Sequence, residues 1–170
     1  TLGLWYIKGA RFDPVGYSDS NYVGDRVDRK STSGTCHFHG RSSVCWSSRK
    51  QNCVSLSTAK AEYIAASACC TRLLWMKQTL KYYDIQFKKI PLLCNNESAI
   101  KIAHNPMQHS RTKHIEVRHH FLCDHVARED IVISHVNTEE NLADIFTKPL
   151  DEKRYCALWC ELNIRDSANM

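Results

Sequence analysis

The stretch that decides the fold runs from Ser57 to Tyr83 and reads STAKAEYIAASACCTRLLWMKQTLKYY. From Glu62, the residues at positions 66, 69, 73, 76, 80 and 83 are Ala, Cys, Leu, Met, Leu and Tyr, and this alternating spacing of four and three predicts a long helix with one apolar stripe. Ser57 is a suitable N-cap, although Lys60 stands where a capping box carries Glu or Gln. Because Glu62 begins the stripe, its carboxylate is predicted to face the core, where it needs a partner such as a metal ion.

The residues before this helix predict an antiparallel meander. Residues 14–24 read as a strand, and the polar cluster at 28–34 reads as a turn. Two further strands are predicted at 35–39 and 43–47, joined by a turn at 40–42.

The residues after the helix predict two more strands, separated by helices. The expected elements are a strand at 91–95, helices at about 97–104 and 114–128, a strand at Ile131–Val136, a helix starting after Thr138 and a closing helix at 151–164. This order of elements indicates an α/β protein with a mixed sheet covered by helices.

Composition fits one globular domain, because 43% of the 170 residues are hydrophobic. No apolar run approaches the roughly 18 residues that a transmembrane helix needs, and the first residues do not resemble a signal peptide. The chain starts without Met, inside what reads as a strand, so we expect it to be a piece of a longer protein.

Nine cysteines raise the alternatives of disulfides or a zinc site. No two of them form a Cys-x-x-Cys pair, and Cys69 and Cys94 occupy apolar positions of the pattern. Buried free thiols in a reducing compartment are therefore the preferred interpretation.

Positive charge is concentrated near the N-terminus. Residues 1–60 hold nine Lys or Arg and four Asp or Glu, whereas the remaining residues hold 14 of each. Such a distribution suits a polyanionic partner such as a nucleic acid, and an ordinary solvated hairpin surface explains it about equally well.

Histidines recur every five residues at positions 104, 109, 114 and 119. Residues five apart do not share a helical face, so the pattern does not predict a ligand array. We interpret these histidines as solvent-exposed, or as core side chains with hydrogen-bond partners. His114 is the exception, because it lies within a motif described below.

Four polar residues in separate segments are candidates for one metal site: Asp19, Glu62, Asn95 and Asp144. Strand-end and helix-start carboxylates can hold Mg²⁺ through hard oxygen ligands, and two such ions activate a water and stabilise a leaving oxygen in phosphodiester hydrolysis. Asp19, on the first strand, suits a position that bridges the two ions. Glu62 and Asp144, on helices, suit positions on either side of it.

Five segments carry a resemblance to a known family: Gly16–Ser20, Asp28–Gly34, Ser57–Ala65, Arg111–Ile115 and Ala143–Leu150. In this order they are similar to the ribonuclease H domain of Ty1/copia-type retrotransposon Pol polyproteins. The resemblance implies a ribonuclease H-like fold with a five-stranded mixed sheet, in which the three N-terminal strands are antiparallel and the strands at 91–95 and 131–136 are parallel. It also implies a domain over residues 1–150, with residues 151–170 forming a C-terminal helix and tail of the same domain.

The resemblance further implies magnesium-dependent endonucleolytic cleavage of the RNA strand of an RNA–DNA hybrid. The metal-binding and catalytic positions fall on Asp19, Glu62, Asn95 and Asp144, for two Mg²⁺ ions that Mn²⁺ can replace. The family usually has Asp at the third position, so Asn95 removes one negative charge, and we expect strongly impaired cleavage with little effect on folding. The expected nucleic-acid contacts are Ser20, Asn21, Arg49, Lys50, Gln51, Arg111, Lys113 and His114.

The partners implied are the hybrid and the reverse transcriptase domain of the same polyprotein, without a membrane or a small-molecule cofactor. An intracellular location, in a cytoplasmic virus-like particle or the nucleus, is expected rather than secretion. A catalytically inactive nucleic-acid-binding or scaffold remnant remains an alternative. A third possibility is an interaction or effector protein without a nucleic-acid role, which would show no salt-dependent hybrid binding.

Overall fold

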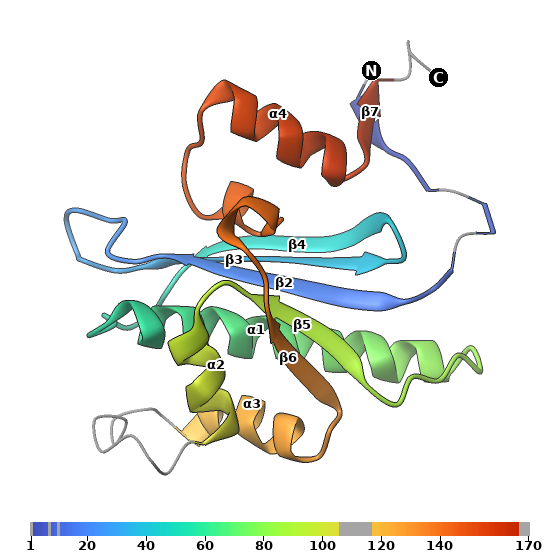
Figure 1. Ribbon diagram of the computed structural model, residues 1–170, viewed down its shortest axis with the longest axis horizontal. Coiled ribbons are helices and arrows are strands. Elements are labelled where there is room, and N and C mark those ends of the chain that lie inside the picture. Colours follow the sequence, from blue (N-terminus) through green and yellow to red (C-terminus); the bar gives the residue numbers. More distant parts are fainter. Residues whose placement is uncertain (1, 7, 10, 106–116, 167–170) are drawn as a thin grey trace.

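A five-stranded mixed sheet with the strand order β4-β3-β2-β5-β6 forms the centre of the molecule (Figure 1). The computed structural model describes residues 2–6, 8–9, 11–105 and 117–166. The strands are β2 (Pro14–Asn21), β3 (Thr32–His39), β4 (Ser42–Lys50), β5 (Ile90–Cys94) and β6 (Ile131–His135). β2, β3 and β4 are antiparallel neighbours, whereas β5 pairs in parallel with both β2 and β6. The predicted fold class is confirmed.

The β2–β3 connection is shorter than the sequence predicted. Residues 28–34 were expected to form a turn, but Thr32–Gly34 belong to β3 and pair with Asp19–Asn21. The turn is closed by the Asp25 carboxylate, which accepts hydrogen bonds from the backbone N–H groups of Val27 and Asp28 at 2.8 and 3.2 Å. This local closure leaves the residues from Thr32 onward free to pair with β2.

The long helix α1 (Thr58–Lys81) covers one face of the sheet (Figure 1). Ser57 is its N-cap, since the hydroxyl accepts a hydrogen bond from the Lys60 N–H at 3.2 Å. The predicted stripe is buried from Glu62 to Leu80, but its last member, Tyr83, is 73% exposed. The helix ends at Lys81, before that position, and Asp84 adopts a left-handed backbone conformation with a φ of 61°.

Two shorter helices pack beside β5 and β6. α2 (Glu97–His104) is capped by the Asn96 side chain, which accepts from the Ala99 N–H at 2.9 Å. α3 covers Val117–Ala127, so the predicted start at 114 lies outside the described residues. Leu73, Leu92, Leu122 and Ile131 are buried in one hydrophobic cluster that joins these helices to the sheet and α1.

The segment after β6 differs from the prediction of a helix beginning after Thr138. It forms two short 3-10 turns, η3 (Thr138–Glu140) and η4 (Asp144–Phe146). Asn141 lies between them, fully buried, and its side chain donates to the Ser18 carbonyl at 2.9 Å and accepts from the Ala143 N–H at 3.1 Å. The Asn141 side chain thus bonds both to β2 and to the backbone N–H of the second residue after it. Because these bonds replace the regular helical pattern, a continuous helix does not form.

The C-terminal segment lies on the sheet face opposite α1 (Figure 1). α4 (Glu152–Glu161) replaces the longer helix expected at 151–164, and its Leu158 is buried. The last three residues of the described chain, Ile164–Asp166, form β7, which pairs with β1 (Leu2–Leu4) in a small antiparallel sheet that the sequence did not predict. The start of the chain was expected to be a strand, as β1 is, whereas β7 has too few residues to show an alternation in sequence.

The cysteines are all free thiols. Five of them are buried, among them Cys69 and Cys94 as expected, whereas Cys53, Cys156 and Cys160 are exposed. In the described ranges, no helix is long and apolar enough to cross a membrane.

Candidate active site

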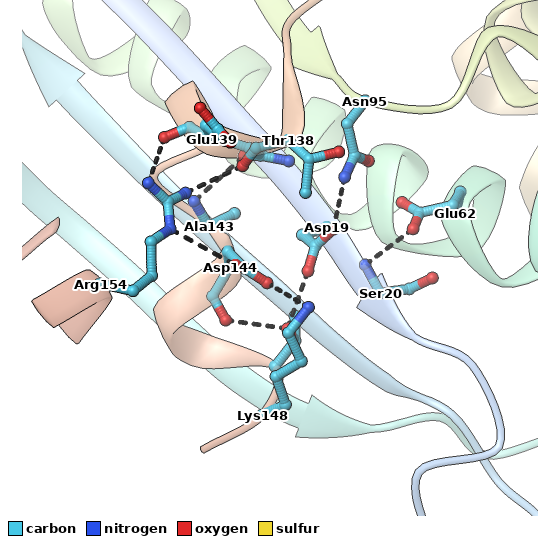
Figure 2. Close-up of polar contacts among 12 residues, drawn as sticks. Asp19, Ser20, Glu62, Asn95, Thr138, Glu139, Ala143, Asp144, Lys148 and Arg154 are labelled. Carbon is cyan, nitrogen blue, oxygen red and sulfur yellow. Dashed lines mark hydrogen bonds and ion pairs between the residues drawn. The ribbon is translucent and has the colours of Figure 1, made fainter. Parts of the chain in front are cut away.

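The fold brings Asp19, Glu62, Asn95 and Asp144 to one end of the central strands (Figure 2). Asp19 lies on β2 and Asn95 directly follows β5, whose Cys94 is the register partner of Ser18. The Asn95 Nδ2 donates a hydrogen bond to Asp19 Oδ1 at 3.0 Å. Glu62, in the second turn of α1, accepts from the backbone N–H of Ser20 at 3.2 Å. Asp144 begins the η4 turn, so it does not lie on the α-helix that the sequence predicted.

Burial makes this cluster electrostatically costly. The pKa of Glu62 is raised to about 8, first by burial and then by the negative charge of Asp19. The pKa of Asp19 is also raised by burial, and Asp144 adds to the effect, while the hydrogen bond from Thr147 acts in the opposite direction. A nearby cation would favour the ionised forms of both groups.

Two basic residues that the sequence analysis did not single out surround Asp144. The Lys148 Nζ lies 2.8 Å from Asp144 Oδ1, and the Arg154 Nε lies 3.9 Å from Oδ2. Arg154 is held by two backbone carbonyls of the η3 turn, with Nη2 donating to Thr138 at 2.9 Å and Nη1 donating to Glu139. The Thr147 hydroxyl donates to Asp19 Oδ2 at 2.8 Å. Asn95, Thr147, Lys148 and Arg154 thus supply the polar partners of Asp19 and Asp144.

Hard oxygen atoms remain unpartnered beside these contacts. Glu62 Oε2, Asn95 Oδ1 and Ser20 Oγ are buried and have no hydrogen-bond partner. Carboxylate and amide oxygens are suitable ligands for Mg²⁺, so the donor atoms fit a hard divalent cation. In the part of the chain that the structure describes, however, no three His, Cys, Asp or Glu side chains are already arranged as a metal site. Instead, the cationic groups of Lys148 and Arg154 lie beside the Asp144 carboxylate.

Four of the predicted nucleic-acid contacts lie beside this cluster. The strand register places Ser20, Ser33 and Arg49 in one row across β2, β3 and β4. Asn21, Thr32 and Lys50 form the next row. These two rows contain the residues that come directly after Asp19 on β2. Residues distant in sequence therefore lie side by side at this end of the sheet.

Lys50, one of these four, and Gln51 are already bonded within the protein. Lys50 pairs with Asp25 and, at 2.8 Å, with Asp28, so its charge is compensated within the hairpin. Gln51 is buried, and its amide donates to the Ser33 hydroxyl at 2.9 Å and to the Ala61 carbonyl at 3.0 Å, which ties the end of β4 to α1. Arg111, Lys113 and His114 lie outside the described residues.

The histidine pattern does not build a site among the described side chains. His104 is exposed at the end of α2, and His109 lies outside the described residues, as does the side chain of His119. Among the histidines whose side chains are described, His37 is buried; its Nε2 lies 3.4 Å from the Cys69 carbonyl oxygen and its Nδ1 lies 3.3 Å from the Cys45 carbonyl oxygen.

Gly34 allows η4 to approach the sheet. It is the register partner of Asp19, and a Cβ there would lie 2.6 Å from both the Ala143 carbonyl oxygen and the Thr147 Cγ2. The absence of a side chain therefore lets the Asp144 turn close over β3. The motif Asp28–Gly34 contained this residue, but the need for glycine depends on a contact with a segment more than 100 residues away.

The order of the strands, the long helix across the sheet and the polar cluster at the sheet end define a ribonuclease H-like protein. Solved structures agree with this class. RNase H1 from the archaeon Halobacterium salinarum aligns with a TM-score of 0.55 at 18% identity, over 79% of this chain and 94% of that one. LC11-RNase H1, isolated from compost and solved with an RNA/DNA hybrid, aligns with a TM-score of 0.54 at 15% identity, over 79% and 94%. The prototype foamy virus protease-reverse transcriptase aligns with a TM-score of 0.56 at 16% identity, over 84% of this chain and 21% of that one.

Sequence relatives give the family. The Pol polyprotein of transposon TNT 1-94 from Nicotiana tabacum is 37% identical over 145 residues, which are 84% of this chain and 11% of the polyprotein. The Pol polyprotein of transposon RE1 from Arabidopsis thaliana is 33% identical over 154 residues, or 90% and 10%. No protein-family model matches the chain. The chain is a ribonuclease H-like domain of the retrotransposon Pol family, and it spans about a tenth of the length of these polyproteins.

Proposed function

We propose that this domain binds RNA–DNA hybrids and that its intact ancestor cleaved their RNA strand with divalent cations, a reaction that Asn95 strongly impairs here. The observation that carries the proposal is the convergence of Asp19, Glu62 and Asp144 at the end of the sheet with an amide at the fourth position. Similarity to an RNase H1 solved with an RNA/DNA hybrid supports the substrate class.

Each residue has a defined part in this proposal. Asp19, Glu62, Asp144 and the Asn95 carbonyl oxygen would hold the cation, which when bound supplies the charge stabilisation that phosphodiester hydrolysis requires. Glu62 Oε2 and Asn95 Oδ1 are the buried acceptors that this role needs. Asn95 differs from Asp because it contributes no charge and because its Nδ2 donates to Asp19 Oδ1. Compared with Asp, it therefore weakens the attraction of the centre for Mg²⁺ or Mn²⁺.

The hybrid is proposed to lie across the end of the sheet beside Asp19. Ser20 and Asn21 are the neutral polar candidates next to the reacting phosphate, and Arg49 on β4 is a cation in the same row as Ser20. Hybrids are recognised largely through backbone shape and 2′-hydroxyl groups, which such side chains can contact. Arg111, Lys113 and His114 remain proposed contacts from the sequence motif. Gln51 is proposed to position the strand end, because its amide is already bonded inside the protein.

Cleavage of a labelled RNA–DNA hybrid, in Mg²⁺ and separately in Mn²⁺, tests the proposal. Asn95→Asp is expected to cleave faster than the natural chain by about 100-fold or more, because a charged ligand is restored. Asn96→Asp is the matched control, since Asp is equally suited to the N-cap position that Asn96 occupies. The double variant Asp19→Asn with Asn95→Asp should be inactive. Cleavage by the natural chain as fast as by Asn95→Asp would overturn the proposed impairment.

A second candidate function is nucleic-acid binding without catalysis. It is favoured by the contacts of Asp144 with Lys148 and Arg154 and by the Asn95–Asp19 hydrogen bond. These contacts stabilise the negative charges of the two carboxylates without a metal ion. Salt-dependent hybrid binding without cleavage by either the natural chain or Asn95→Asp would select this function. An absence of salt-dependent hybrid binding would contradict both candidates.

We further propose a reverse transcriptase domain as a partner within the same polyprotein, because the relatives are Pol polyproteins and one structural neighbour is a protease-reverse transcriptase. An intracellular location, in a cytoplasmic particle or the nucleus, is proposed from the nine free cysteines.

A further inference from the structure

Lys148 occupies a special position among the basic residues of the centre. It follows Asp144 by four residues, and its Nζ lies 2.8 Å from Asp144 Oδ1 (Figure 2). The Asp144 side chain is only 5% exposed, whereas that of Lys148 is 43% exposed. The charge of Lys148 also acts on Asp19 and Glu62, where it favours the ionised carboxylates. One ammonium group therefore contacts Asp144 and acts electrostatically on the other two carboxylates of the cluster.

Arg154 and Lys148 are held differently. Arg154 is fixed by the Thr138 and Glu139 carbonyls, and its Nε remains 3.9 Å from Asp144. Among the described residues, the ion-pair partner of Lys148 is Asp144, and its half-exposed side chain can move into solvent. An ammonium group at this distance from Asp144 would be repelled by a divalent cation that shares the same carboxylate.

We propose that Lys148 is a built-in counterion that holds Asp144 in place without metal and is displaced when a divalent cation binds. Lys148 is thus a positioning residue that sets the cation affinity of the centre. Displacement by the cation rests on the proposed function, whereas the stabilisation of the metal-free centre rests on the Lys148–Asp144 contact alone. The two parts are measured separately, and neither measurement uses a hybrid.

The first measurement is the Mn²⁺ affinity of the 170-residue chain, by titration calorimetry. Lys148→Met is expected to bind Mn²⁺ about tenfold tighter or more than the natural chain, because coupling between two cations at one carboxylate is reciprocal. Lys148→Arg should remain close to the natural chain. Lys101→Met is the matched control, since Lys101 also follows its carboxylate partner, Glu97, by four residues, but in an exposed pair. An unchanged or weaker Mn²⁺ affinity of Lys148→Met would overturn the displacement.

The second measurement is thermal unfolding in the presence of a chelator. Lys148→Met is expected to unfold at a lower temperature than Lys148→Arg, because the buried Asp144 loses its closest cation. Equal unfolding temperatures of these two variants would overturn the counterion role, whatever the outcome of the cleavage assay.

A third measurement uses the natural chain, in case Lys148→Met does not fold. The lysine ¹³Cε signals are followed by NMR during titration with Mg²⁺, with Lys101 as the internal reference. The signal of Lys148 is expected to shift as the cation binds, while that of Lys101 stays in place. Saturation with Mg²⁺ that leaves the Lys148 signal unchanged would contradict the displacement.

Discussion

At the scale of single residues, Asn95 determines how the centre behaves without a cation. Its amide donates to Asp19 at 3.0 Å, whereas an Asp at this position would place two carboxylates against each other. We predict that Asn95→Asp lowers the unfolding free energy by about 1–3 kcal/mol in a chelator, because Asp19 loses a donor and gains a like charge. Thermal unfolding with and without Mg²⁺ measures this effect. Asn96→Asp should change stability little, and equal losses in both variants would show that the effect is not specific to position 95.

Glu62 gives the stability of the metal-free domain a defined pH dependence. Burial raises its pKa from the ordinary value of 4.5 to about 8 in the folded protein. Between these pH values, the folded chain therefore binds more protons than the unfolded chain. Stability is therefore predicted to be highest near and below pH 4.5 as far as this group is concerned, and to fall as the pH rises toward 8. Chemical denaturation at several pH values, in a chelator, checks this prediction. Glu62→Gln should flatten the dependence in this window, and an unchanged slope in the variant would contradict the assignment to Glu62.

At the scale of secondary-structure elements, the η4 turn is positioned by its contact with β3. A Cβ at Gly34 would lie 2.6 Å from a backbone oxygen of Ala143, which cannot move without displacing Asp144. Gly34→Ala is predicted to destabilise the domain by about 1–3 kcal/mol, as overpacking does, and to weaken Mn²⁺ binding. Unfolding and calorimetric titration measure the two effects. Gly3→Ala is the control, because a Cβ there meets nothing within 4 Å.

A substitution at the N-terminus of α1 is predicted to stabilise the domain. Ser57 caps the helix through the Lys60 N–H, but the positive charge of Lys60 lies at the positive end of the helix dipole. Lys60→Glu completes a capping box and is predicted to stabilise the domain by about 0.5–1 kcal/mol, as measured by chemical denaturation. The same change combined with Ser57→Ala should lose most of this gain. A destabilising effect of Lys60→Glu alone would show that Lys60 has a role elsewhere in the fold.

At the scale of the whole molecule, the C-terminal segment is joined to the rest of the domain by several contacts. Arg154 on α4 bonds to η3, Leu158 is 1% exposed, and β7 pairs with β1 at the other end of the chain. Leu158→Ala is predicted to cost about 2–5 kcal/mol and to lower the unfolding temperature of the entire domain in one transition. Calorimetry and circular dichroism should report coincident midpoints. A separate early transition for α4 would instead show that residues 151–170 form an independent unit.

The sequence by itself determined the elements with strong periodicity. The buried stripe of α1 and the strands around Asp19, Leu92 and Ile133 were predictable because long alternation or helical spacing is a local property of the chain. The motifs around Asp19, Glu62, Asn95 and Asp144 also allowed the family and the members of the polar cluster to be proposed.

Only the tertiary structure decided what surrounds those four residues. The bond from Thr147 to Asp19 spans 128 positions, and Gly34 is required only because η4 packs against it. Burial raises the pKa of Glu62, and the charge of Lys148 acts on all three carboxylates, because separate segments come together at one end of the sheet. Charge balance depends on distances between groups, and a sequence fixes such distances only after β2, α1, β5 and the η4 turn have packed together.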